Sequence, residues 1–147
     1  MDAKLLIVDP ESGSRDALTR FFSRCGFRVE TALDGLECVD KIDVFHPDVV
    51  LANVDAPWGD AAASAALDPE CSVAAFLVMG EATPPVLSRR TGVSESFCFS
   101  KPLRLDHLLD QVGLAVAMLD LHARLEARRP FRQRRALPVL EAEACLN

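Results

Sequence analysis

The chain has 147 residues, 50% of them hydrophobic, and a formal net charge of -6. This length supports one ordinary hydrophobic core with an appendage, and the composition excludes a disordered or fibrous chain. No apolar run is long enough to span a membrane and no signal peptide precedes Lys4, so we expect a cytoplasmic protein without a membrane span.

In chain order, short apolar runs alternate with segments of helical periodicity, and turn or cap residues separate them. The expected elements are a strand at 4–9, a helix from Ser12 or Ser14 to Gly26, a strand at 27–31, a helix at 36–44, a strand at 48–53, a short helix ending at Leu67, a strand at 73–79, a short helix at 84–90, a weak strand at 97–99 and a long helix from Leu103 toward Arg129.

Strands that alternate with helices imply right-handed crossovers and a parallel sheet covered on both faces. We therefore predict a doubly wound five-stranded α/β fold with an extended C-terminal helix and tail. Functional sites of such sheets lie at the carboxyl ends of the strands. The residues at these ends, and hence the candidates for the site, are Asp9, Asn53, Met79 and Lys101.

The order and spacing of several motifs resemble the receiver domains of two-component response regulators. These motifs are Leu-Ile-Val-Asp at 6–9, Pro-Asp-Val-Val-Leu at 47–51, Pro57 with Asp60 behind it, and Ser-Lys-Pro-Leu at 100–103. The resemblance covers roughly residues 3–118 and implies a flavodoxin-like sheet of strand order 2-1-3-4-5. We divide the chain into a receiver-like domain at 1–119 and a helical extension with a basic tail at 120–147.

The acceptor and metal positions of this family are altered. A family receiver accepts a phosphoryl group on an Asp at the end of the third strand, and this position holds Asn53, whose amide is not a nucleophile of that kind. The acidic pair that holds Mg²⁺ in the family falls on Asp9 and Pro10, and proline offers no ligand. Glu11 is expected to be a solvated loop carboxylate rather than a metal ligand. Asp9 therefore has no acidic partner and is only a weak candidate for binding a metal ion, and no cofactor is expected.

The switch positions are altered as well. The family's Ser or Thr after the fourth strand falls on Met79, which cannot donate a hydrogen bond, and its aromatic residue on the fifth strand falls on Cys98. Lys101 remains, before a peptide bond to Pro102 that is usually cis in the family. We expect Lys101 to make a polar contact with Asp9 or with the Asn53 amide and so to hold the strand ends together.

The loop after Asn53 holds two further candidates. Asp55 is a conceivable substitute acceptor, although a loop carboxylate two positions away is displaced from Lys101 and usually points to water. Trp58, the single Trp of the chain, either packs over the site or contacts a partner. Packing over the site is the favoured interpretation.

The C-terminal segment differs in charge from the rest of the chain. Residues 1–120 carry 10 basic and 19 acidic side chains, whereas residues 121–147 carry 6 Arg and 3 Glu. The basic run 128–135 is long enough to touch nucleic acid, an acidic membrane surface or an acidic protein, but no DNA-reading module fits here and specific DNA binding is not expected. An apolar stripe of the long helix predicts a homodimer through this helix; it consists of Leu109, Val112, Val116, Leu119 and Ala123.

Together these features predict a degenerate pseudo-receiver that is not an enzyme. It would act as a phosphorylation-independent signalling and protein-interaction module of a two-component phosphorelay pathway, with a histidine kinase or a downstream effector as its partner. Two alternatives stay open. One is an unconventional receiver that accepts phosphate on Asp9, Glu11 or Asp55, and the other is a nucleic-acid accessory protein that uses the basic tail.

Overall fold

A computed structural model describes residues 3–68, 70–71 and 73–128, and shows one five-stranded parallel sheet of strand order β2-β1-β3-β4-β5. The predicted sheet and strand order are therefore confirmed. The strands are β1 (Lys4–Val8), β2 (Arg28–Ala32), β3 (Val49–Asn53), β4 (Ala75–Gly80) and β5 (Cys98–Ser100).

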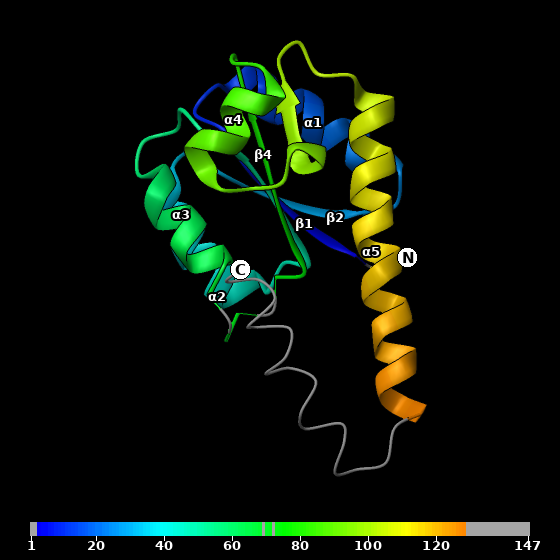
Figure 1. Cartoon of the computed structure of the whole chain (residues 1–147). Coiled ribbons are helices and arrows are strands. Elements are labelled where there is room, and N and C mark those ends of the chain that lie inside the picture. Colours follow the sequence, from blue (N-terminus) through cyan, green and yellow to red (C-terminus); the bar gives the residue numbers. More distant parts are fainter. Residues whose placement is uncertain (1–2, 69, 72, 129–147) are drawn as a thin grey trace.

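Helices cover both faces of the sheet (Figure 1). Helices α1 (Ser12–Arg24) and α5 (Leu105–Arg128) pack on one face, where they share a hydrophobic core with the strands. The other face is covered by α2 (Gly35–Phe45), α3 (Gly59–Ala66) and α4 (Pro84–Thr91), and a 3-10 turn, η1 (Glu95–Phe97), precedes β5.

Alternation along the strands divides the core into two layers. Leu5 and Ile7 of β1 point to the side of α1 and α5, whereas Leu6 and Val8 point to the side of α2, α3 and α4. All four are at most 1% exposed. This double burial explains why β1, β3 and β4 read as continuous apolar runs in the sequence.

Some predicted boundaries are wrong by one or two residues. Helix α1 begins at Ser12, but its N-cap is Glu11 and no side chain caps it, so the predicted Ser caps are not found. It ends as predicted before Gly26, whose φ of 94° suits glycine. The fourth strand begins at Ala75 rather than at Val73, because its pairing with β3 starts where Ala75 lies beside Val49.

Two residues of the stripe that was predicted to pair in a homodimer meet the sheet instead. Val112 and Val116 are buried against the sheet, together with Leu108 and Ala115. The large apolar side chains that α5 does expose lie on another face; they are Leu114, Met118, Leu121 and Leu125. Helix α5 carries apolar residues on both sides, so periodicity alone did not identify which side meets the sheet.

No helix within the described ranges is long and apolar enough to cross a membrane. The part of the predicted basic run that follows Arg128 lies outside the described residues. The predicted contact of that run with nucleic acid therefore lies outside the described residues as well.

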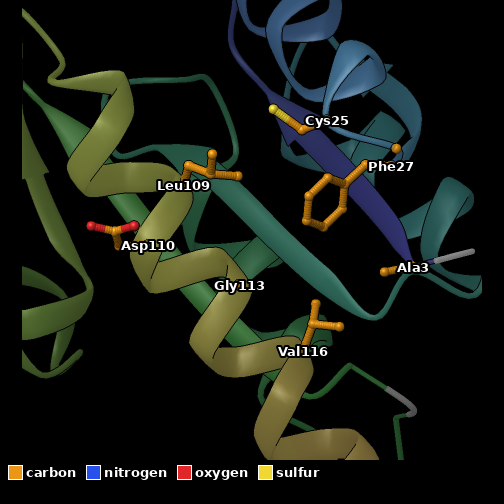
Figure 2. Close-up of a pocket in the computed structure, with 8 residues that line it drawn as sticks. Ala3, Cys25, Phe27, Leu109, Asp110, Gly113 and Val116 are labelled. Carbon is orange, nitrogen blue, oxygen red and sulfur yellow. The ribbon is translucent and has the colours of Figure 1, made fainter.

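A pocket of about 370 Å³ lies between α5 and the turn that joins α1 to β2 (Figure 2). Ala3 and Phe27, which precede β1 and β2, line it together with Gly113 of α5. Because the strands are parallel, this pocket is at the amino edge of the sheet. It is therefore on the opposite side from the carboxyl ends where the candidate residues were predicted.

Gly35 allows α2 to approach the loop between β3 and α3. Its N–H donates to the Pro57 carbonyl at 2.8 Å. A Cβ added at Gly35 would lie 1.6 Å from the carbonyl oxygen of Trp58, a backbone atom that no rotamer change can move. Only glycine fits at this contact.

Replacing Gly35 with alanine is expected to lower the free energy of unfolding by about 1–3 kcal/mol, because the backbone must shift to accept the methyl group. Urea unfolding monitored by circular dichroism measures this change. The matched control is Gly113→Ala, where the added Cβ has no atom within 4 Å. It should raise stability by about 0.5–1 kcal/mol through helix propensity. Equal stability of the two variants would contradict the close contact at Gly35.

Candidate functional site at the carboxyl edge of the sheet

The fold brings together three of the predicted site residues at the carboxyl edge. Asp9 directly follows β1, Asn53 is the last residue of β3, and Lys101 directly follows β5. Asp9 is 0% exposed and is the one polar or charged residue buried to this degree in the described parts of the chain. A buried charge of this kind requires partners.

Several groups donate hydrogen bonds to the Asp9 carboxylate, and the Ser14 side chain is one of them. Lys101 Nζ lies 3.0 Å from Asp9 Oδ2, and the backbone N–H of Glu11 donates to Oδ1 at 2.9 Å. The Asn53 amide donates to the same Oδ1 at 3.5 Å. The predicted polar contact of Lys101 is therefore confirmed for Asp9, whereas the Asn53 amide, the other partner offered, binds Asp9 instead.

The backbone of Lys101 is bound to the neighbouring strand. Its N–H donates to the Gly80 carbonyl at 2.8 Å, which continues the pairing of β5 with β4 by one residue. The bond to Pro102 is cis. The Lys101 side chain is only 16% exposed, so its ion pair with Asp9 is largely shielded from water.

Burial alone would raise the pKa of Asp9, but the hydrogen bond from the Glu11 N–H and the neighbouring Lys101 ammonium more than offset it and hold the pKa below its usual value. Asp9 is thus ionised at neutral pH. Since the folded state binds its proton less tightly than the unfolded state, the resulting stability is present above the unfolded pKa of about 4 and is lost as the pH falls through the folded value.

Both polar atoms of the Asn53 side chain are engaged. Nδ2 faces Asp9, and Oδ1 accepts a hydrogen bond from the Asp55 N–H at 2.9 Å. This second bond folds the chain back directly after β3. Asn53 therefore acts as a neutral link between the β1 end and the following loop.

Lys101 forms its ion pair with Asp9 rather than with either of the two other carboxylates named as alternatives. Glu11 is exposed, as predicted. Asp55 is about half exposed and pairs with Arg90 of α4, with 3.3 Å between Asp55 Oδ1 and Arg90 Nη2. Sequence reasoning missed Arg90, because nothing in the spacing links two residues 35 positions apart.

The residues at this edge do not fit the Mg²⁺ ion that receivers of the family use. Mg²⁺ prefers an octahedral oxygen shell that includes carboxylates, whereas Asp9 is already paired with Lys101 and Pro10 has no ligand atom. Within residues 3–68, 70–71 and 73–128, no three His, Cys, Asp or Glu side chains lie close enough together to hold a metal.

Met79 and Cys98 are part of the packed interior. Met79 is 0% exposed and belongs to the core layer on the side of α1 and α5, while Cys98 is 4% exposed and belongs to the other layer. Burial raises the pKa of the Cys98 thiol, whose Sγ lies 3.3 Å from the Ser94 carbonyl oxygen. Both positions thus contribute packing on opposite faces of the sheet.

Trp58 does not pack over the site, so the favoured interpretation was wrong. Its side chain is 63% exposed, and its backbone is left-handed, with φ 60° and ψ 30°. A bulky residue rarely adopts this conformation, which costs on the order of 1 kcal/mol or more. The sequence carried no signal for it, because the left-handed turn at the start of α3 is normally marked by Gly or Asn.

Replacing Asp9 with asparagine is expected to lower the free energy of unfolding by about 1–3 kcal/mol at neutral pH, because Lys101 keeps its charge and loses its counter-ion. The difference in the free energy of unfolding between Asp9→Asn and the natural chain should shrink below about pH 4, where the natural carboxylate also takes up a proton. Urea unfolding at several pH values measures both effects.

The control for Asp9 is Asp106→Asn. Asp106 also has a lowered pKa, first through the His107 N–H and then through Arg104, but its ion pair is exposed to solvent. Its replacement should change stability far less at any pH, because water and salt screen the pair. A loss at Asp9 no larger than the loss at Asp106 would show that burial does not strengthen the Asp9–Lys101 contact.

Comparison with known proteins shows which proteins the chain resembles. No family model matches the chain. Sporulation initiation phosphotransferase F of Bacillus subtilis is 28% identical over 116 residues, which cover 76% of this chain and 92% of that protein. Response regulator MprA of Mycobacterium sp. (strain KMS) is 39% identical over 57 residues, and the matched segment spans 25% of MprA.

The structural comparison agrees with these relatives. The solved structure of the Vibrio cholerae chemotaxis protein CheY4 has 22% sequence identity and a TM-score of 0.67, and the match covers 78% of this chain and 99% of that one. At this identity the likeness shows the fold alone. The chain is thus homologous to response-regulator receiver domains of two-component signalling and has their fold.

Proposed function

We propose that the chain is a signalling module of the response-regulator type that works without phosphorylation of its own acceptor position and without Mg²⁺. Its role would be to bind a histidine kinase or a downstream effector rather than to catalyse a reaction. The face formed by α4, β5 and α5 is the proposed binding surface for this partner, with Trp58 as an additional contact. The fold supplies the rigid support for both.

The observation that carries this proposal is the closed set of contacts around Asn53. The acceptor position holds a neutral amide, and both of its polar atoms already have partners in Asp9 and Asp55. The single buried carboxylate nearby is neutralised by Lys101. The edge is therefore balanced in charge without a metal ion or a phosphoryl group.

Mass spectrometry after incubation with acetyl phosphate and Mg²⁺ tests this proposal. The natural chain should gain no phosphate, because an amide does not form an acyl phosphate and Asp9 is buried in an ion pair. A receiver that has the acceptor Asp serves as the positive control. A gain of one phosphate that disappears in Asp55→Asn would instead establish Asp55 as the acceptor. If the phosphate disappears in Glu11→Gln or in Asp9→Asn, the replaced residue is the acceptor.

Trp58 is the proposed contact for a partner because the structure exposes it at an energetic cost. Trp58 is the one largely exposed aromatic residue of the described chain. Leu33, which precedes α2, and Leu36, in its first turn, lie on either side of the Gly35 that contacts the Trp58 backbone, and they are 48% and 49% exposed. Exposed aromatic residues flanked by apolar ones are typical of binding sites.

Affinity purification from the native cell, with quantitative comparison of variants, tests the role of Trp58. Trp58→Ala should reduce recovery of the main partner by about tenfold if the ring contributes like a typical interface anchor. Val44→Ala, which removes another exposed apolar side chain from α2, and Asn53→Asp should both leave recovery unchanged. If Asn53→Asp loses the partner and the other two variants keep it, the acceptor position regulates binding.

A further inference from the structure

Helix α5 has two apolar faces, and only one of them meets the sheet. Its inner face is buried and consists of Leu108, Val112, Ala115 and Val116. Its outer stripe consists of Leu114, Met118, Leu121 and Leu125, which are 53%, 57%, 49% and 48% exposed. A helix with one packed face normally carries polar residues on the other, so the outer stripe requires an explanation.

The spacing of the outer stripe is that of a helix-pairing surface. Its members follow one another at intervals of four, three and four residues, the alternation typical of the core positions of a coiled coil. At 3.6 residues per turn they occupy an arc of about 60° on the side of α5 away from the inner face. A straight apolar ridge of this kind fits another helix.

The outer stripe also continues past the globular part of the domain. Of the described residues after Val116, none is buried, and the end of α5 extends beyond the sheet (Figure 1). Leu121 and Leu125 therefore lie on a part of the helix that the rest of the described chain does not cover. A partner helix can reach them without moving the sheet or its other helices.

We propose that the outer stripe binds the same stripe of a second copy of this chain, with the two α5 helices antiparallel. The intervals read the same from either end of the stripe. Two copies related by a two-fold axis therefore place Leu114 against Leu125 of the second copy and Met118 against Leu121 of the second copy. Each large apolar side chain gains an apolar partner, as a symmetric interface requires.

The charges along α5 select the antiparallel arrangement. The first half of the helix carries Asp106 and Asp110. In the second half Asp120 pairs with Arg124 on the same helix, and Glu126 and Arg128 follow. Figure 2 shows Asp110 on the side of α5 turned away from Phe27. Asp110 precedes Leu114 by four residues of the helix, so it lies next to the outer stripe. In an antiparallel pair Arg128 is level with Gln111 of the second copy, within reach of Asp110, whereas a parallel pair would place Arg128 beside Arg128. Opposed helix dipoles favour the same arrangement.

Sedimentation equilibrium of the full chain over a range of concentrations tests this proposal. The natural chain should show a monomer–dimer equilibrium, and Met118→Glu and Leu121→Glu should each raise the dissociation constant about tenfold or more. Both positions are exposed in the monomer, so the circular dichroism spectrum and the unfolding midpoint of the monomer should be retained. Val44→Glu, at an exposed apolar position of α2, is the matched control and should leave the dissociation constant unchanged.

A charge exchange tests the orientation of the two helices. Asp110→Arg and Arg128→Asp should each weaken the dimer, and the double variant should restore it, because the antiparallel pair brings these positions together. A natural chain that stays monomeric, as it would if the stripe served a different protein, would overturn the proposal. So would a dimer that both glutamate variants leave intact. A dimer that Arg128→Asp strengthens would overturn the antiparallel arrangement.

Discussion

Two opposite charges from distant parts of the chain hold the carboxyl edge of the sheet together. Asp9 follows the inner strand β1, and Lys101, 92 residues later, follows the edge strand β5. Strands β3 and β4 lie between them, so the ion pair connects the ends of two strands that are not neighbours in the sheet. A carboxylate as buried as Asp9 is costly without a counter-ion, so each residue makes the other necessary.

The same pair determines which chemistry is possible at this edge. A second carboxylate at position 53 would leave an excess negative charge beside Asp9 and would favour a cation. With the neutral Asn53, the positive charge of Lys101 and the negative charge of Asp9 cancel, and the amide adds hydrogen bonds on both of its sides. Structural stability and the proposed loss of phosphorylation thus have one physical origin.

The parts of the fold that depend on local pattern could be predicted from the sequence. Continuous apolar runs identified the buried strands, and the family spacing identified Asp9, Asn53 and Lys101 as neighbours. Features set by tertiary contacts could not be predicted in this way. The rotation of α5 is one of them, because apolar residues occur on both of its faces. The left-handed backbone of Trp58 is another, because this conformation depends on the path of the loop rather than on the residue itself.

The contact between Gly35 and the Trp58 carbonyl also affects how Trp58 can be used. Because α2 fits directly against that carbonyl oxygen, and the Gly35 N–H binds the preceding one, the loop is fixed at the base of the indole ring. A side chain presented from a fixed loop loses little conformational entropy when it is covered. Because Gly35 of α2 fixes the loop, Trp58 would contribute more to the affinity for a partner than the same ring on a mobile loop.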